Sequence, residues 1–417
     1  MDDALAAYDF AAPPLIRFGA GRIDEIGEVV GLWGRRAWIV GGGRSLAASG
    51  ARQPIDASLA AAGIDARLVA TSNGEPTVEQ VAAALAGLAH EDRDSVVVVA
   101  VGGGATIDLA KAVAAMATNM PADLRSSPDL ESHLDTLVVD HLEGVGRGLA
   151  IRHWPLPVVA VPTTAGTGAE ATRNAVISCP RRRFKKSMRS PMMVPRVALV
   201  DPDLTASCDP STIAASGLDC ITQLIESFVC RFAKPLPRCL VIESLPRALH
   251  ALPRLLEHAD PGDDSLQRAT SRAADRAALS HAALLSGLAL ANSGLGLAHG
   301  VAAALGIACG APHGVACAVM LPAAMRVNRE AAERDFAALE RAVAPDASPH
   351  DAAAADAFVD RIERLCLVAG APRRLSDLGV ARDQLDWLAE NSGGASMRGN
   401  PVQLPAAELR SLLATML

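Results

Sequence analysis

The feature that most constrains the fold is a hydrophobic run that ends in three glycines. The segment DSVVVVAVGGG occupies residues 94–104 and leads directly into the helical pattern ATIDLAKAVAAMAT. An unbroken β-branched run is typical of a strand buried on both faces, as in parallel sheets covered by helices. Glycines before a helix let the backbone approach a pyrophosphate, whose charge the free helix N–H groups stabilise. The turn is not GxGxxG, and a tight strand-helix turn without a ligand remains the alternative.

A second glycine-rich turn strengthens the first. The segment PVVAVPTTAGTGAE at 157–170 repeats the strand-to-turn pattern. RRAWIVGGG at 35–43 and IDARLVAT at 64–71 also have the pattern of strands, and TVEQVAAALAGLAHE at 77–91 has helical spacing. This alternation predicts a parallel sheet with helices on both faces. Two Gly/Thr-rich turns at the carboxyl edge of such a sheet can flank one dinucleotide.

The chain is too long for one ordinary core, and its character changes near residue 200. Alanine- and leucine-rich helical segments dominate from there to the end. We therefore expect an α/β dinucleotide-binding domain with a Rossmann-like parallel sheet at 1–203. An all-α domain is expected at 204–417.

Charge and composition exclude several classes of protein. The net charge of -7 opposes nucleic-acid binding, which needs a basic face. The short basic run at 181–186 is expected to be a solvated loop. Residues 277–325 lack Asp, Glu, Lys and Arg, but Gly, Asn, His and Pro interrupt the run before it reaches the roughly 20 residues that cross a bilayer. Buried core helices, without membrane insertion, are the expectation.

Terminal and cysteine patterns indicate a cytoplasmic protein. The start, MDDALAAYDF, lacks the basic flank and apolar centre of a signal peptide. The eight cysteines form no CxxC pair. They are expected to be small buried hydrophobic residues in a reducing compartment, outside any disulfide or zinc site.

Taken together, the two turns resemble the iron-dependent (group III) alcohol dehydrogenase family, which carries GGGSxxDxAK and PTTAGTGSE at this separation. The resemblance runs over nearly the whole chain, and its further matches are DPDL (201–204), GLDCITQLIE (217–226), GLAHG (296–300), APHGVACAVMLP (311–322) and NP (400–401). It implies a dehydroquinate synthase-like architecture. It also implies an NAD(P)-dependent oxidoreductase that transfers hydride between nicotinamide and a small alcohol or carbonyl compound.

The resemblance also implies a set of cofactor-binding residues. By similarity, the pyrophosphate side would be formed by Gly102, Gly103, Gly104 and Asp108. The nicotinamide half would be lined by Thr163, Thr164, Thr167 and Thr172, and Lys185 would contact a cofactor ribose. Each has a structural alternative, because threonines cap helices and lysines are usually solvated.

One departure concerns the choice between NAD(H) and NADP(H). NAD-preferring relatives carry an aspartate where this chain has Gly42, and Arg44 and Ser45 follow. Loss of a carboxylate and gain of a cation favour the 2'-phosphate of NADP(H). The alternative is that Arg44 points to solvent.

A second departure affects the metal site. Where the family holds Asp, His, His and His, this chain has Asp219, Gln223, His299 and His313. Asp219 and Gln223 are four residues apart and share a helix face, whereas the two histidines lie on different elements. Asp219, His299 and His313 are the expected catalytic residues and hold Fe(II) or another divalent metal, completed by Gln223 or water. In the other interpretation, Gln223 forms hydrogen bonds in a metal-free site.

Other functions stay open at this point. Many relatives place a histidine where Ala303 stands, so a proton route must run elsewhere. A metal-independent oxo-acid reductase, resembling maleylacetate reductase, would use Arg173 or Arg189 for carboxylates. A lyase such as dehydroquinate synthase, or a non-catalytic nucleotide-binding or assembly subunit, is also conceivable. The relatives imply a homodimer or larger homo-oligomer.

Overall fold

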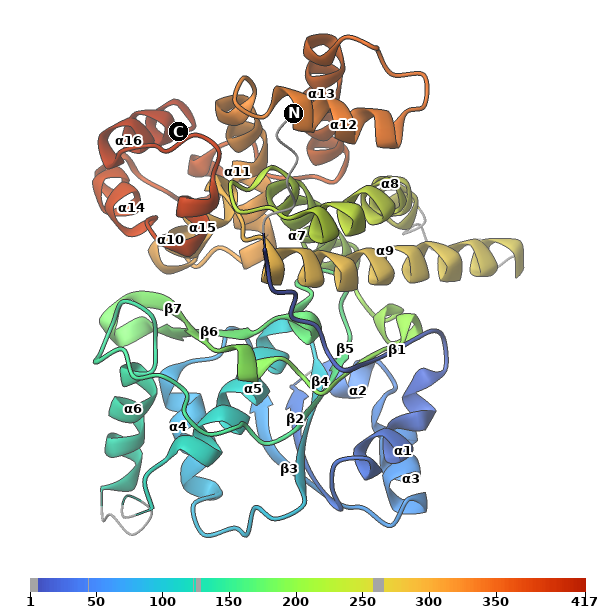
Figure 1. The fold of residues 1–417 in the computed structure, drawn as a ribbon, viewed down its shortest axis with the longest axis vertical. Helices are drawn as coiled ribbons and strands as arrows, with labels where there is room; N and C mark the ends of the chain where they lie inside the picture. The colour runs from blue at the N-terminus through green and yellow to red at the C-terminus, as the bar shows by residue number, and fades with distance from the viewer. Residues whose placement is uncertain (1–6, 44, 123, 125–128, 258–265) are drawn as a thin grey trace.

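The computed structural model describes residues 7–43, 45–122, 124, 129–257 and 266–417. An α/β part and a helical part lie one above the other (Figure 1). Six parallel strands form the central sheet in the order β1-β8-β5-β4-β2-β3. These strands are β1 (Leu15–Phe18), β2 (Arg36–Gly42), β3 (Asp65–Ser72), β4 (Val96–Gly102), β5 (Val158–Pro162) and β8 (Val197–Val200). The parallel sheet expected from the valine-rich runs is confirmed.

Helices cover both faces of this sheet, as the continuous apolar runs require. Along β4, Val97, Val99 and Val101 pack with α1 and α3, whereas Val98 and Ala100 pack with α4, α5 and α6. Figure 1 shows these two helical layers on opposite sides of the strands. The helices of this part are α1 (Ile26–Gly31), α2 (Ser45–Ala48), α3 (Arg52–Ala61), α4 (Val78–Gly87), α5 (Gly104–Asn119) and α6 (Leu130–Asp140).

The order of the strands reverses between β2 and β4. The chain passes from β2 outward to β3 and then returns to place β4 on the other side of β2. The carboxyl ends of β2 and β4 therefore flank the topological switch point, where open α/β sheets bind their ligands. Gly41 and Val101 are register partners at that end, one residue before Gly42 and Gly102.

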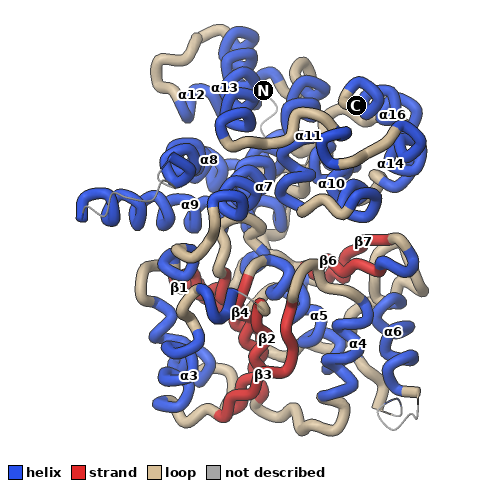
Figure 2. The backbone as a smooth tube through the Cα atoms, turned by 180° about the vertical axis from the view of Figure 1, so that it is seen from behind, coloured by secondary structure: helices blue, strands red, loops and turns tan. Residues whose placement is uncertain are grey.

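An antiparallel hairpin was not expected from the sequence. It consists of β6 (Asn174–Cys179) and β7 (Phe184–Arg189), and β7 contacts helix α10 of the helical part. Figure 2 shows the hairpin at the edge of the α/β part that faces the helices. The basic run at 181–186 enters β7, and the Lys185 side chain is only 7% exposed. The expectation of a solvated loop is therefore wrong for the second half of the basic run, which pairs with β6 as part of strand β7.

The second half of the described chain is helical, and α7 lies at its centre. Residues Gly217 to Val229 of α7 are buried on all sides by neighbouring helices, which explains their apolar composition. The helices are α7 (Pro210–Val229), α8 (Pro235–Glu257), α9 (Leu266–Asn292), α10 (Leu297–Cys309), α11 (His313–Asn328), α12 (Glu333–Val343), α13 (Asp351–Val368), α14 (Leu385–Asn391), α15 (Ala395–Gly399) and α16 (Ala406–Thr415). An α/β domain followed by a helical domain is the expected fold class.

Two further expectations concern boundaries and membranes. The proposed division between residues 203 and 204 falls inside the 3-10 helix η6 (Pro202–Thr205), between β8 and α7.

The charge-free run at 277–325 forms the end of α9, then α10 and most of α11. Among the described residues, no single helix is long and apolar enough to cross a membrane. One pair of helical segments, Ala269–Asn292 and Leu297–Cys309, would together be long and apolar enough, but the two are bent by 100° relative to each other.

Candidate active site at the domain interface

The turns after β2 and β4 meet at the switch point. A Cβ built on Gly42 would lie 2.0 Å from Ser45 Oγ and 3.3 Å from Thr106 Oγ1. A Cβ on Gly102 would lie 2.4 Å from the same Thr106 oxygen. Only glycine fits these approaches without displacement of a neighbour. Arg44, the expected cation of this turn, lies outside the described residues.

The start of α5 lies against the threonine-rich turn. Gly103 is the N-cap residue of α5 and supplies no side-chain cap. A Cβ on Gly103 would stand 3.4 Å from Thr164 Oγ1, and one on Gly104 would stand 2.4 Å from Thr167 Oγ1. The N–H group of Thr163 donates to the carbonyl of Gly102 at 3.0 Å. A helix N-terminus without a side-chain cap, lying between two glycine-rich turns, suits an anionic phosphate group.

Two of the expected cofactor residues take part in a buried network. Lys111 is 1% exposed, and its Nζ lies 3.0 Å from Asp108 Oδ1 and 2.9 Å from Thr172 Oγ1. It also donates to the carbonyl of Ala169 at 3.0 Å. The other Asp108 oxygen accepts from the backbone N–H of Val176 at 3.0 Å. Asp108 and Thr172 thus hold the threonine-rich turn and β6 against α5, and their contact with a cofactor stays a prediction.

Lys185 bridges the hairpin and the helical domain. Its ammonium forms an ion pair with Glu75 and lies 4.0 Å from where a Cβ on Gly306 of α10 would stand. Burial and the positive charge of Lys185 lower the pKa of His313 to about 4. Lys185 is therefore close enough to influence the residues across the interface, whereas its contact with a ribose stays a prediction.

The threonine-rich turn packs directly on the helical domain. A Cβ on Gly166 would lie 2.7 Å from Ser216 Cβ in α7. A Cβ on Gly168 would lie 2.4 Å from the Cα of Gly287 in α9. These contacts fix α7 and α9 beside the turn that crosses the start of α5.

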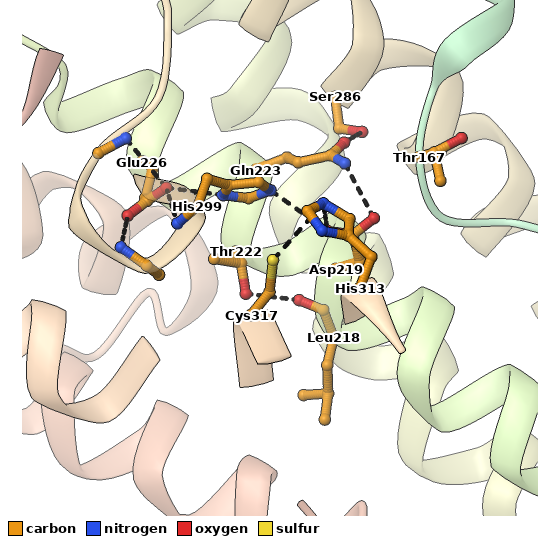
Figure 3. A network of polar contacts seen from close by, with 12 residues as sticks. Thr167, Leu218, Asp219, Thr222, Gln223, Glu226, Ser286, His299, His313 and Cys317 are labelled. Carbon is orange, nitrogen blue, oxygen red and sulfur yellow. Dashed lines mark hydrogen bonds and ion pairs between the residues drawn. The ribbon is translucent and has the colours of Figure 1, made fainter. Parts of the chain in front are cut away.

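Four potential metal ligands converge in the helical domain (Figure 3). Asp219 comes from α7, His299 from α10, and both His313 and Cys317 from the first turns of α11. One ligand atom from each residue lies within 4.8 Å of all the others. Asp219 Oδ1 is 3.2 Å from His299 Nε2 and 3.8 Å from His313 Nε2, and Cys317 Sγ is 3.8 Å from the same His313 nitrogen. Their oxygen, nitrogen and sulfur donors fit a divalent transition metal.

The ionisation of the cluster follows from its burial. Although burial opposes the charged form of Asp219, attraction to His313 and a hydrogen bond with His299 lower the pKa of its carboxyl. Burial likewise opposes protonation of His299, but Cys317 and Asp219 raise the pKa of its ring. Burial raises the pKa of the Cys317 thiol to about 12. The cluster therefore combines an anionic carboxylate with a thiol that stays neutral unless a cation is beside it.

Gln223 lies beside the cluster, and its amide is engaged at both ends. Its Nε2 donates to Asp219 Oδ2 at 3.1 Å, and Ser286 Oγ donates to its Oε1 at 2.7 Å. Figure 3 shows Gln223 directed toward Ser286 and away from Cys317. The expectation that Asp219 and Gln223 share one face of a helix is confirmed, and that His299 and His313 lie on different elements is confirmed too.

Glu226 and Asn400 position the helix that carries His299. Glu226 accepts from the N–H groups of Gly296 at 3.0 Å and Ala298 at 2.6 Å, and its Oε2 lies 2.7 Å from His299 Nδ1. Asn400 Oδ1 accepts from the N–H of Leu297 at 3.0 Å. Both residues cap α10, whose N-cap glycine offers no side chain. The Nε2 atom of His299 is thereby directed at Asp219.

Comparison with known proteins identifies the family. A model of iron-containing alcohol dehydrogenase matches residues 13–202, and a model of the C-terminal part of the Fe-containing alcohol dehydrogenase family matches residues 213–417. The chain belongs to the iron-containing alcohol dehydrogenase family. A relative in Salmonella typhimurium, "Probable alcohol dehydrogenase EutG", is 30% identical over 97% of this chain and 93% of its own.

Solved structures agree with this assignment to the iron-containing alcohol dehydrogenases. A 1,3-propanediol oxidoreductase is 27% identical, with a TM-score of 0.83 over 99% of this chain and 100% of its own. A sulfoacetaldehyde reductase from Bifidobacterium kashiwanohense, solved in complex with NAD+, is 26% identical, with a TM-score of 0.80 over 99% of each chain. The chain is therefore an oxidoreductase with alcohol dehydrogenase activity, and a lyase or a non-catalytic subunit no longer describes it.

For this iron-containing alcohol dehydrogenase, Cys317 is the residue that sequence analysis missed. All eight cysteines are free, and five are buried as expected, whereas Cys239 is exposed; Cys317 lies in a cluster that could hold a metal, which the cysteine pattern did not indicate. Its position four residues after His313, on the same helix face, was the available signal.

Ala303, one turn after His299, is partly buried and offers no proton-transfer group. Of the two candidate arginines for a carboxylate, Arg189 is paired with Glu143 at 2.8 Å.

Proposed function

We propose that this chain transfers hydride between a nicotinamide dinucleotide and a small alcohol or aldehyde, with assistance from a divalent metal. The expected nucleotide site comprises the turns containing Gly42 and Ser45, the glycines Gly102 to Gly104, and Thr163 to Thr167. The expected metal site comprises Asp219, His299 and His313. Binding of NAD+ by the related sulfoacetaldehyde reductase supports a nicotinamide cofactor.

The observation that carries this proposal is a continuous series of contacts from the nucleotide side to the cluster. Gly168, at the end of the threonine-rich turn, touches Gly287 of α9. Ser286 precedes Gly287 and donates to Gln223, which donates to Asp219. A nucleotide held on the sheet edge and a substrate at the cluster would therefore lie on the two sides of one closely packed interface, as hydride transfer between them requires.

The residues of the site have distinct tasks in this reaction. A bound divalent metal supplies Lewis acidity that polarises a carbonyl oxygen or stabilises an alkoxide. Glu226 orients His299 through Nδ1, and Gln223 orients Asp219 through Oδ2. Because the described residue at 303 is an alanine, the alcohol proton would pass to water or to a cofactor hydroxyl.

NADP(H) is the proposed preference. No carboxylate extends from Gly42, and the space above it is filled by Ser45, whose Oγ would lie 2.0 Å from an added Cβ. A 2'-phosphate at this turn would therefore meet a neutral hydroxyl where NAD-preferring relatives carry an aspartate. The test is the ratio of kcat/KM for NADPH to that for NADH. A preference for NADH above about tenfold, or about 1.4 kcal/mol, would reject this choice of cofactor.

The decisive experiment is a cofactor-coupled screen of small aldehydes and oxo acids with the chelated protein, before and after addition of a divalent metal. Metal-dependent reduction of aldehydes is the expected result. Equal activity of the metal-free protein, confined to oxo acids, would reject the proposal and favour the oxo-acid reductase. If neither NADPH nor NADH changes its fluorescence when titrated with the protein, the nucleotide site itself is rejected.

A further inference from the structure

The cluster suggests a ligand set that the sequence pattern did not predict, and the inference rests on the metal-assisted function proposed above. We propose that Cys317 is a metal ligand, that Gln223 is not, and that the resulting Asp219, His299, His313 and Cys317 site binds zinc. The three points that support it are the spacing of the ligand atoms, the engagement of Gln223 and the chemical character of the four donors.

For three pairs of donors, the spacing of the ligand atoms is close to that of a tetrahedral zinc site. Zinc bonds of about 2.0–2.3 Å place tetrahedral ligand atoms about 3.3–3.8 Å apart. The Asp219 oxygen lies 3.2 Å from the His299 nitrogen and 3.8 Å from the His313 nitrogen, and that His313 nitrogen lies 3.8 Å from Cys317 Sγ. One ligand atom from each of the four residues also lies within 4.8 Å of all the others, so the four donors surround one position.

Gln223 does not present its oxygen to the ligand atoms of the cluster, because that oxygen is directed at Ser286 (Figure 3). Ser286 Oγ donates to that oxygen at 2.7 Å, and the amide nitrogen is turned to Asp219 Oδ2. To bind a metal through this oxygen the amide would have to turn, which would leave Asp219 Oδ2 without its donor. Gln223 instead holds one carboxylate oxygen, so that Asp219 Oδ1 faces the two histidines, which is the task of a residue that orients a ligand.

The donor set itself favours zinc over Fe(II). Thiolate sulfur is a soft ligand that selects zinc among the common divalent ions, and zinc binds carboxylate, imidazole and thiolate together. Zinc also stands above Fe(II) in the general order of affinity for such sites. On binding, the S–H bond of Cys317 breaks, its proton passes to the buffer, and a metal-sulfur bond forms without any change of oxidation state.

Cobalt(II) is the probe, because a cobalt-thiolate bond produces an intense charge-transfer absorption that oxygen and nitrogen ligands do not. The full-length protein is stripped with a chelator and loaded anaerobically with one equivalent of Co(II). The wild type and Gln223→Ala are expected to show the band. Cys317→Ala is expected to lose the band and to bind zinc about 100-fold or more weakly. This loss is at least as large as the one expected when a residue that only orients a metal ligand is replaced.

The matched control is Cys366→Ala, which removes a buried thiol of α13 outside the cluster and is expected to retain the band and the zinc affinity. Absence of the band in cobalt-loaded wild type, or its persistence in Cys317→Ala, would overturn the inference. If Cys317→Ala does not fold by circular dichroism, the wild-type spectrum decides alone. Tighter binding of Fe(II) than zinc in competition would overturn the choice of metal.

The outcome is separable from that of the proposed function. A wild type with the charge-transfer band but no NAD(P)H-linked turnover would reject the function and leave the ligand set intact. Metal-dependent turnover without the band would reject the ligand set alone.

Discussion

Gly168 and Gly287 touch backbone to backbone where the α/β domain meets the helical domain. Gly168 has a φ of 60°, and a Cβ on it would lie 2.4 Å from Gly287 Cα. A Cβ on Gly287 would in turn lie 2.2 Å from the Gly168 carbonyl oxygen. Both positions therefore require glycine, and the contact sets the distance between the nucleotide turn and the helix that carries Ser286.

Gly287→Ala should separate the two elements. We expect a loss of about 1–3 kcal/mol in the free energy of unfolding, the usual cost of overpacking, together with a fall in kcat. Thermal unfolding and steady-state kinetics measure the two effects. Gly87→Ala is the control, because a Cβ at that helix-terminal glycine meets nothing within 4 Å. Equal melting temperatures for Gly287→Ala and Gly87→Ala would contradict the importance of this contact.

Lys111→Met should destabilise the threonine-rich turn. The substitution leaves Asp108 without its partner at 3.0 Å and removes the donors to Ala169 and Thr172. Breaking a buried pair on one side costs about 3–5 kcal/mol, which urea denaturation measures. Thr172→Val, which removes one hydroxyl that accepts from Lys111 and donates to the carbonyl of Ala169 but leaves the ion pair with Asp108, should cost only about 1 kcal/mol. A Lys111→Met protein as stable as the wild type would contradict the role of the network.

The strands that end in the glycine-rich turns were predictable, because a strand that is buried on both faces has a continuous apolar sequence. The sequence pattern located β2, β3, β4 and β5, each within a few residues of its observed bounds. It did not reveal β1 and β8, which span only four residues each. It also missed β6 and β7, because their alternation is hidden by the basic residues around Lys185, whose burial depends on Glu75 and α10.

The residues of the candidate site were likewise predictable only in part. Asp219, His299 and His313 could be assigned because each lies within a motif shared with the family, namely GLDCITQLIE, GLAHG and APHGVACAVMLP. Cys317 could not, because a lone cysteine in an apolar helix resembles a core residue until α7 and α10 place their ligand atoms beside it. The engagement of Gln223 was equally hidden, since its partner Ser286 lies 63 residues away.

Glu170→Gln should stabilise the protein in a pH-dependent manner. Burial raises the pKa of Glu170 from its ordinary value of 4.5 to about 7, despite the nearby charge of Lys111. Between these values the folded state keeps a proton that the unfolded state loses, so this group makes stability fall as the pH rises toward and through 7. The advantage of Glu170→Gln over wild type should grow by about 3 kcal/mol from pH 4 to pH 8.

The unfolding free energies of the two proteins, followed across that pH range, test this expectation. The exposed Glu408→Gln serves as the control and should track the wild type at every pH. An advantage of Glu170→Gln that shrinks with rising pH would show that the folded protein prefers the charged carboxylate.

Glu226→Gln should weaken metal binding at the proposed site, although it changes no proposed ligand atom. The substitution replaces a carboxylate that lies 2.7 Å from His299 Nδ1 and accepts from the N–H groups of Gly296 and Ala298. The amide keeps the size but loses the negative charge at the start of α10 and turns an NH2 group toward backbone donors. Zinc affinity, measured by competition with a chromophoric chelator, should fall by about 10- to 100-fold.

Glu340→Gln separates this effect from a general loss of stability. Glu340 is 3% exposed and accepts two hydrogen bonds from Arg361, at 2.9 and 2.6 Å, on helices away from the cluster. Its replacement should lower the melting temperature and leave zinc affinity unchanged, because no residue of the cluster contacts it. If both variants bound zinc as the wild type does, Glu226 would be only a helix cap, and the orientation of His299 would depend on Asp219 alone.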